Sequence, residues 1–473
     1  MGKKGSFKLG GNTILKGADT DTHTNRDIAY MREGRAGKSW QYYDNKLRNL
    51  FTRLGMELNY WLGKKVYLSA SDYVTYQRRH TLRANYLDTD ESLVSNGKPT
   101  TIDALNGMND LTRSLRNQLT LKATITPVKP LMIMPAFSWT MNHDKSQFRY
   151  GELDTTAVRT SHAIEPSLFV KWKISRAHNV DLRFAYTTTV PELVSTIGYR
   201  NTIDPTYITT GNTQLRNSHS HTTTFNYHRM WLRKQIVLGL NASYTKNINP
   251  VATLFRYNSL TGVYESKPMN VKGGDAWNAG VSYDQGIGVY FRLMNEFRLT
   301  KSKSYGFLTI VDNDAPDAQP ELNTQSLLGI NDNIDFSYES EKVRMKLFGR
   351  LRWNRYRYDD ASYNSSPVRL MYGLDATLKF DPVEFSMTLN DDYRANYQTS
   401  SLNGHKLIAL ASASYTFYKN KMRLTVSADD IFNKFRIYNT TYSAFQRTET
   451  STDFLHHFLQ VSLTYKFDAK AKK

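Results

Sequence analysis

Apolar and polar residues alternate with a period of two over many stretches of this chain, and this pattern restricts the possible folds more than any other feature. In residues 372–380, Tyr, Leu, Ala, Leu and Phe occupy one phase, whereas Gly, Asp, Thr and Lys occupy the other. Residues 180–187 and 343–354 alternate in a similar way. Because successive side chains of a β-strand point to opposite faces, each stretch predicts a strand with one apolar and one polar face. The predicted fold class is therefore all-β.

The connections between these stretches fall into two length classes. Short turns are predicted at residues 62–65, 127–130, 175–179, 232–234, 285–288, 339–342, 381–382 and 419–421. Longer polar connections are predicted at residues 88–113, 191–218, 247–275, 300–323 and 356–367. Short turns at one end and long loops at the other are typical of a transmembrane antiparallel β-barrel of the outer-membrane type. The pattern indicates roughly 17–18 strands.

The composition agrees with a barrel and excludes several other classes. Mean hydropathy is −0.56, which a barrel tolerates because only every second strand residue faces lipid. The chain has no cysteine, so disulfides and thiolate metal sites are excluded. A net charge of +19 would favour a nucleic-acid partner. The Lys and Arg residues are spread over loops and polar strand phases, however, so we expect a lumenal or structural role and no nucleic acid.

The pattern divides the chain into three parts. Residues 1–48 are rich in Gly, Thr, Asp, Asn and Lys and predict a loop or a frayed strand. Residues 49–467 are expected to form the outer-membrane β-barrel, and residues 468–473 a basic tail. No apolar stretch of about 7–15 residues follows the basic start, as it would in a signal peptide, so we expect an export signal upstream.

Two short motifs carry a resemblance to a known family. Gly211, Asn212 and Leu215 lie in a segment that resembles the G-N-P-x-L-x-x-E segment of TonB-dependent receptors. The segment departs from that pattern with Thr213 in place of Pro and Asn217 near the position of Glu.

The second motif lies near the C-terminus. Asp430, Phe432 and Asn433 follow a predicted strand and resemble the D-x-F-N segment of the same receptors. The stretch from Tyr60 to Tyr67 is also similar to the Bacteroidetes subfamily of these barrels. The resemblance covers about residues 49–467.

The resemblance implies the barrel of a TonB-dependent receptor in the outer membrane, which takes up a siderophore, glycan or peptide. Such barrels have about 22 strands, which exceeds the strand number expected here. The implied partners are outer-membrane lipid, a plug domain and through it TonB, a small-molecule or oligomeric nutrient, and in some cases a surface lipoprotein. We recognise no signal peptide, TonB-contacting segment or plug in residues 1–473 and therefore expect an incomplete receptor.

Two other functions agree with the same residues. A passive outer-membrane porin or adhesin would show the same strand pattern, and an acidic plug encoded upstream would distinguish the receptor from it. A soluble basic β-protein that binds nucleic acid or polysaccharide is the third hypothesis, which detergent dependence would exclude. No catalytic or cofactor-binding motif is present, so we expect neither enzymatic activity nor a cofactor.

Several groups of polar residues are candidates for metal or acid–base sites. The candidates are His219 with His221, His456 with His457, Asp391 with Asp392, and the loop residues Asp312, Asn313, Asp314 and Asp317. Adjacent strand residues point apart, which argues against a shared site for the adjacent pairs. The loop lacks the glycine and terminal Glu of a calcium-binding EF-hand loop. Interfacial or solvated polar side chains explain all of these groupings, and no metal site is predicted.

The polar phase of one predicted strand carries an unusual number of cations. Arg344, Lys346, Arg350 and Arg352 all face the lumen if the phase of Val343 faces lipid. Interior residues of such barrels are polar and determine what passes or docks. This lumenal basic wall predicts contact with an acidic plug, which we favour, or attraction of an anionic substrate.

Overall fold

The computed structural model describes residues 4–30, 35–96, 98–204, 206–259, 261–311, 320–442, 447–452 and 455–467. Over these residues the chain is almost entirely β-structure, with six single-turn 3-10 helices and 26 strands. None of the described helices has the length and hydropathy needed to cross a membrane. The expected all-β class is thus confirmed.

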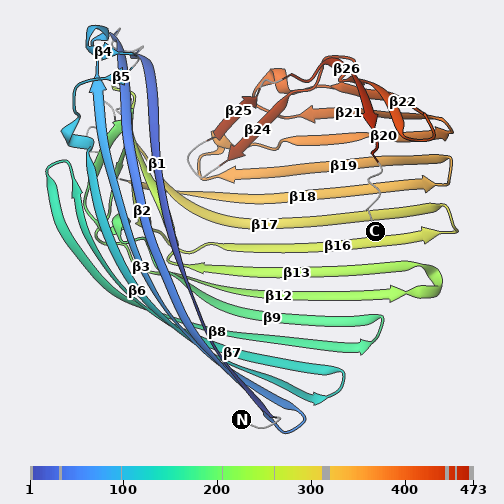
Figure 1. The fold of residues 1–473 in the computed structure, drawn as a ribbon, viewed down its shortest axis with the longest axis horizontal. Helices are drawn as coiled ribbons and strands as arrows, with labels where there is room; N and C mark the ends of the chain where they lie inside the picture. The colour runs from blue at the N-terminus through green and yellow to red at the C-terminus, as the bar shows by residue number, and fades with distance from the viewer. Residues whose placement is uncertain are drawn as a thin grey trace.

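Eighteen strands form an antiparallel meander in which each pairs with the next. In chain order they are β1 (Gly5–Tyr30), β2 (Arg35–Leu62), β3 (Val66–Asp88), β6 (Met108–Val128), β7 (Leu131–Tyr150), β8 (Leu153–Ser175), β9 (His178–Thr189), β12 (Ser218–Trp231), β13 (Ile236–Ile248), β16 (Asp275–Ile287), β17 (Phe291–Val311), β18 (Glu321–Glu339), β19 (Val343–Tyr358), β20 (Val368–Phe380), β21 (Val383–Ala395), β22 (Leu407–Phe417), β23 (Met422–Asp429) and β26 (Phe458–Tyr465). Figure 1 shows them as one strongly curved sheet.

The remaining elements lie in the longer connections. They are β4 (Val94–Ser95), β5 (Lys98–Pro99), β10 (Arg200–Asp204), β11 (Tyr207–Thr210), β14 (Val251–Asn258), β15 (Val263–Asn270), β24 (Ile437–Tyr442), β25 (Arg447–Thr452), and the 3-10 helices η1 (Glu91–Leu93), η2 (Ala104–Asn106), η3 (Val194–Thr196), η4 (Leu232–Lys234), η5 (Ala361–Tyr363) and η6 (Ser400–Leu402). Four of these strands, β10, β11, β14 and β15, pair with the meander or with one another and bring the large sheet to 22 strands. The strands β24 and β25 form a separate hairpin.

The short turns occur where the sequence predicts them. All eight predicted positions separate consecutive strands of the meander, and the eighteen strands agree with the predicted 17–18. At the turn between β2 and β3, Gly63 adopts a φ of 78°, a left-handed conformation that glycine tolerates without steric cost. The long connections all lie at the opposite end of the strands, so the two length classes are segregated as expected for an outer-membrane barrel.

The structure differs from the loop or frayed strand expected over residues 1–48. Most of this stretch belongs to β1 and β2, which pair over their described lengths from Gly5 with Tyr60 to Tyr30 with Arg35. The alternation is weak in β1 because glycine and threonine occupy much of its apolar phase. The partner strand compensates: a Cβ on Gly11 would lie 2.7 Å from the Leu54 side chain, so β2 supplies apolar surface there.

The two faces of the sheet have opposite chemistry. Large apolar side chains such as Leu347, Phe385 and Val426 are well exposed on one face, which a bilayer would cover. The other face carries hydrogen-bonded polar and charged groups. The compact hydrophobic core of a soluble domain is replaced by a small cluster around Phe148, Tyr150 and Ile197, where a loop meets the polar face.

The sheet has two free edges within the described residues. β1 is paired with β2 and β26 with β23, and no described residue pair joins β1 to β26. Figure 1 shows these two strands at the two ends of the curved sheet.

Candidate functional site

A row of cationic side chains crosses five neighbouring strands on the polar face. The strand register places Arg298 of β17 opposite Asn331 of β18, which is opposite Arg352 of β19. Arg352 is in turn opposite Arg369 of β20, and Arg369 is opposite Arg394 of β21. Directly opposed residues of an antiparallel pair lie on the same face, so all five side chains project from one side of the sheet. We call the polar face of β17–β21 the arginine wall.

The next row toward the short turns contains two carboxylates, one amide, one arginine and one methionine. It runs through Glu296, Asn333, Arg350, Met371 and Asp392, again in direct register. The two rows together enclose a cavity of about 500 Å³. Its lining residues are Glu296, Arg298, Asn331, Asn333, Arg350, Leu351, Arg352, Arg369 and Met371.

Most of these guanidinium groups have a carboxylate partner. Arg298 lies 3.0 Å from Glu296, and Arg369 lies 2.7 Å from Asp392. Asp392 also accepts from Arg394 at 2.6 Å, and this carboxylate and Arg394 are only 3% and 4% exposed. Asp392 is therefore shared by two arginines.

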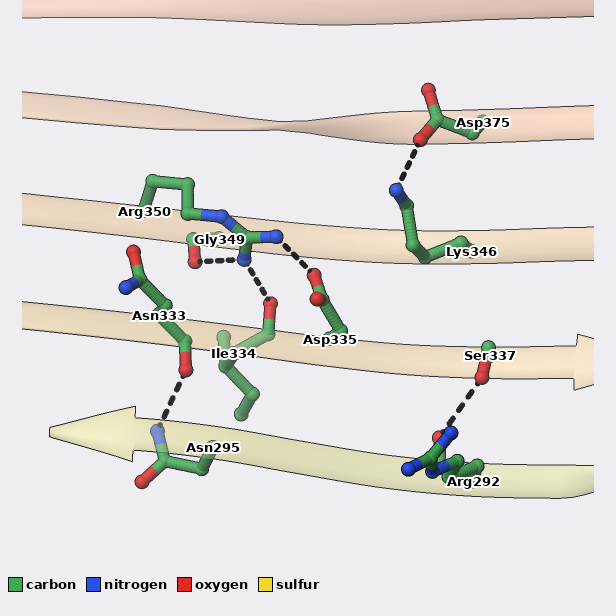
Figure 2. A network of polar contacts seen from close by, with 10 residues as sticks. All are labelled: Arg292, Asn295, Asn333, Ile334, Asp335, Ser337, Lys346, Gly349, Arg350 and Asp375. Atoms are coloured by element: carbon green, nitrogen blue, oxygen red, sulfur yellow. Dashed lines mark hydrogen bonds and ion pairs between the residues drawn. The ribbon is translucent and has the colours of Figure 1, made fainter. Parts of the chain in front are cut away.

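Arg350 is held by the strand next to it. It donates to Asp335 at 2.5 Å and to the Ile334 carbonyl at 2.9 Å. Figure 2 shows this guanidinium reaching across from β19 to β18, with Lys346 paired to Asp375 in the opposite direction. These contacts fix Arg350 as one rigid side of the cavity.

Arg352 differs from the other arginines of the wall. Its Nε donates to the side-chain oxygen of Asn331 at 3.3 Å. Among the residues that the structure describes, no carboxylate lies within ion-pair distance of it. Arg352 thus contributes an uncompensated positive charge in the middle of the row.

The four cations predicted for the lumenal basic wall share one face, but they divide into two groups. Arg350 and Arg352 line the cavity. Arg344 pairs with Glu339 at 2.9 Å beside a short turn, and Lys346 pairs with Asp375 at 2.7 Å. These two lie outside the cavity lining. Arg298, Arg369 and Arg394 were not predicted to belong to this wall, because only strand register brings them to the same row as Arg352.

Tyrosines lie at the long-loop end of the arginine wall. Tyr442 of the β24–β25 hairpin stacks on Tyr356 of β19 at 4.2 Å between ring centroids. Tyr438 of the same hairpin lies 5.5 Å from the Arg394 guanidinium and 4.8 Å from the Lys406 ammonium. The hairpin therefore lies against the end of the wall from which the long loops project.

Electrostatic effects on two loop residues follow from this arrangement. Burial, together with the charge of Arg394, holds the pKa of Lys406 below its ordinary value. Burial also raises the pKa of Tyr397, whereas Arg394 and Arg369 act in the opposite direction. Both shifts indicate that water is partly excluded and that positive charge is concentrated here.

The polar face of β3, β6, β7 and β8 is organised differently, and we call it the loop-covered wall. Asn106 accepts hydrogen bonds from the Tyr150 hydroxyl at 2.9 Å and from the Thr202 backbone N–H at 3.0 Å. Arg159 donates to the Pro191 carbonyl at 2.7 Å. These contacts hold residues 190–203 against the wall and leave a smaller cavity of about 240 Å³.

The first family-like motif has a structural role in that loop. A Cβ on Gly211 would overlap the Ile197 carbonyl, at 1.7 Å, so only glycine permits this backbone approach. Asn212 is buried, donates to the Pro268 carbonyl at 2.8 Å and accepts from the Gln214 backbone at 3.0 Å. The backbone of Leu215 closes the same turn by donating to the Asn212 carbonyl at 3.3 Å.

The second motif also forms a turn. Asp430 is buried and accepts from the backbone N–H groups of Lys434 and Phe435, at 3.0 and 2.8 Å. Asn433 is hydrogen-bonded to His456 at 2.9 Å, whereas Phe432 is largely exposed. The motif thus joins the end of β23 to the segment before β26.

In the described part of the chain, no group of three or more His, Cys, Asp or Glu is placed to hold a metal ion. His219 and His221 pack against Tyr186 at ring distances of 5.6 and 5.5 Å. Asp391 and Asp392 do point apart, since Asp391 accepts from Tyr372 and Asp392 from Arg369.

Two candidate groups remain. The acidic loop of Asp312, Asn313, Asp314 and Asp317 lies outside the described residues, as does the predicted basic tail at 468–473. His457 contacts the Asp430 carbonyl at 2.8 Å, so it takes part in the same turn as the second motif.

A model of the outer membrane protein beta-barrel family matches residues 141–465, which is more than half of the chain. No curated protein matches.

Several solved structures are similar to this chain at low sequence identity, and three of them are 8–9% identical. The chain resembles the copper transporter OprC (8% identity, TM-score 0.41), covering 98% of this chain and 80% of OprC. It also resembles the ferric yersiniabactin uptake receptor FyuA from Yersinia pestis (9%, 0.42), covering 98% and 79% of the two chains. For BauA, the ferric preacinetobactin receptor from Acinetobacter baumannii, the identity is 9% and the TM-score 0.42, with 97% and 73% covered.

Proposed function

The chain belongs to the outer membrane protein beta-barrel family and resides in the outer membrane, and from this premise we propose that it forms the barrel of a TonB-dependent receptor. In this role it takes up a siderophore, glycan or peptide from outside the cell. The Bacteroidetes-type subgroup is part of the same proposal and rests on the motif at Gly211 and the stretch from Tyr60 to Tyr67.

The observation that carries the proposal is the cavity in the arginine wall. It lies on the polar face of a sheet whose opposite face is apolar, so in the membrane it opens toward the lumen. Uncompensated Arg352, and half-exposed Arg369 beside the buried pair of Asp392 and Arg394, give this lumen a site that can hold a ligand. A receptor needs such a site, whereas a passive pore needs only an open channel.

The partners follow from the same role. A plug domain contacts the lumenal face and transmits the pull of TonB, and a surface lipoprotein delivers larger nutrients. Polar side chains such as those of the arginine wall are suited to hold a plug that moves, because charged contacts exchange with water more readily than an apolar core. The role involves binding and passage of a substrate and no covalent chemistry.

The test is to delete the gene for the protein in its native host and measure uptake of a panel of siderophores, glycans and peptides. We expect at least one ligand to lose uptake, and we expect inactivation of TonB to cause the same loss. Uptake that requires the protein but not TonB would show that the protein is a passive channel and would reject the receptor function. Unchanged uptake of every ligand would reject a transport function for this panel.

A further inference from the structure

The register of the arginine wall opposes like charges directly. Arg352 faces Arg369 and Arg369 faces Arg394 in successive strand pairs. Like charges at directly opposed positions of an antiparallel pair destabilise a sheet. Asp392 offsets the repulsion between Arg369 and Arg394, but Arg352 has no carboxylate partner among the described residues, so the folded sheet alone does not account for Arg352.

Counting the charges of the cavity and its immediate partners shows an excess. Five guanidinium groups, those of Arg298, Arg350, Arg352, Arg369 and Arg394, are matched by three carboxylates. Those carboxylates belong to Glu296, Asp335 and Asp392. Two positive charges therefore remain among the described residues, at a site where the sheet limits access of water from one side.

The position of the row favours a ligand that arrives from outside the cell. Arg369 is the second residue of β20, and Arg394 is the last residue but one of β21. Both therefore lie next to the long loops, which face the exterior in outer-membrane barrels. The tyrosines of the β24–β25 hairpin lie at the same end, where Tyr438 contacts Arg394.

We propose that this cavity binds a small organic anion with two or more carboxylate or phosphate groups, recognised by Arg298, Arg352 and Arg369. The planar guanidinium fork matches both groups in a bidentate geometry, and the excess of two charges sets the minimum charge of the ligand. The cavity of about 500 Å³ is within the range that holds small molecules. Asn331 and Asn333 provide neutral hydrogen-bonding groups for the rest of the ligand.

This inference deepens the proposed function, because it names the class of the transported substrate and rests on transport for its biological meaning. The binding itself does not require TonB. Binding and uptake can therefore be measured separately. If the protein binds the anion but does not import it, the transport function is rejected and the binding site is still supported.

The experiment is isothermal titration calorimetry of the full chain, purified in detergent, with two anionic probes. These are benzene-1,3,5-tricarboxylate and fructose 1,6-bisphosphate, which distinguish a carboxylate from a phosphate source. The neutral trimethyl ester of the tricarboxylate is the matched control. We expect at least one anion to bind, the ester not to bind, and affinity to fall with added salt.

Variants locate the binding. Arg352→Gln should lower the affinity for the anion by about tenfold or more, which is the effect expected for loss of one hydrogen bond to a charged group. Arg352→Lys keeps the charge but loses the fork and should give an intermediate affinity. Arg344→Gln, on the same strand and face but outside the cavity, should bind as the parent does. Heat-modifiable mobility on gels checks that each variant is folded.

Two outcomes would overturn the proposal. One is that folded parent protein binds neither anion. The other is that Arg352→Gln and Arg344→Gln reduce affinity equally, which would indicate general charge attraction. A third result would also reject a small-anion site. If the protein binds neither probe but binds an acidic peptide, and Arg352→Gln abolishes that binding, the cavity is a site for an acidic protein segment.

Discussion

The loop-covered wall and the arginine wall lie on the same polar face of one sheet, yet their charged groups have different partners. In the loop-covered wall Arg79 pairs with Asp110 at 3.6 Å and Arg159 with Asp144 at 3.5 Å, one cation to one carboxylate. In the arginine wall one carboxylate, Asp392, serves two arginines. In the first wall these two pairs are matched one to one, whereas in the second wall two arginines share one carboxylate and Arg352 has no carboxylate partner among the described residues.

The difference extends to what covers each wall. Residues 190–203 lie on the loop-covered wall, where Phe148 is 1% exposed and Ser146 is fully buried. The cavity of the arginine wall is about twice as large and is lined by four guanidinium groups. A polar lumenal surface is therefore not sufficient to indicate a binding site. The site is indicated by the larger cavity, in which four guanidinium groups gather.

The largest expected effect separates the two walls by removing one carboxylate from each. Asp392→Asn leaves Arg394 buried without its partner, and we expect a loss of about 3–5 kcal/mol in the free energy of unfolding. Asp110→Asn leaves Arg79, which is well exposed and can be hydrated, so we expect about 1–3 kcal/mol. Urea unfolding in lipid vesicles measures both. Equal losses would contradict the unequal burial of the two arginines.

The comparison also requires that both walls belong to the lumenal face. Leu389, at the centre of β21, is on the apolar face, and replacing it with Arg should cost about 2–4 kcal/mol if it lies near the bilayer midplane. Its neighbour Thr388 donates to Asp375 on the polar face, so Thr388→Arg should cost much less. The same unfolding assay in vesicles compares them. Similar tolerance of Arg at both positions would contradict the membrane orientation.

A smaller effect concerns the loop that covers the first wall. Asn106→Ala removes the acceptor shared by Tyr150 and Thr202, so the loop should detach locally at a cost of about 1–3 kcal/mol. Limited proteolysis should then cleave within residues 190–217 faster than in the parent. An unchanged cleavage rate would mean that the loop is held by other contacts, and the contrast between the two walls would be weaker.

The smallest effect is expected at Arg344. Its pair with Glu339 is exposed on both sides, and exposed ion pairs contribute about 1 kcal/mol or less. Arg344→Gln should therefore change the free energy of unfolding in vesicles only slightly. A loss as large as that of Asp392→Asn would show that the four predicted wall cations act as one unit rather than as two groups.

The sequence predicts the strands and turns well because a strand between lipid and lumen has a strict period of two. Spacing along one strand also places Arg344, Lys346, Arg350 and Arg352 on one face, and their lumenal role stays a prediction. The strand prediction fails for β1, where glycine and threonine weaken the alternation and Leu54 of the neighbouring strand supplies the apolar cover.

The composition of the site could not be predicted from spacing alone. Arg298, Arg352 and Arg369 lie on three strands, and a shift of one residue in register would move an arginine to the other face. The roles of Asn212 and Asp430 in turns could not be predicted either. Their hydrogen-bond partners, Pro268 and Phe435, are determined by the loop conformation. Only the fold connects these residues.

The most direct test of the account is thiol labelling, because the chain has no cysteine of its own. Asn331→Cys places a thiol between Arg298 and Arg352 in the arginine wall, and Ser114→Cys places one in the cavity of the loop-covered wall. Labelling rates are measured in intact outer membranes with anionic and cationic methanethiosulfonate reagents. We expect the anionic reagent to react about tenfold faster at position 331, with no comparable preference at position 114. Equal preference at both positions would contradict the claim that the arginine wall holds excess positive charge facing the lumen.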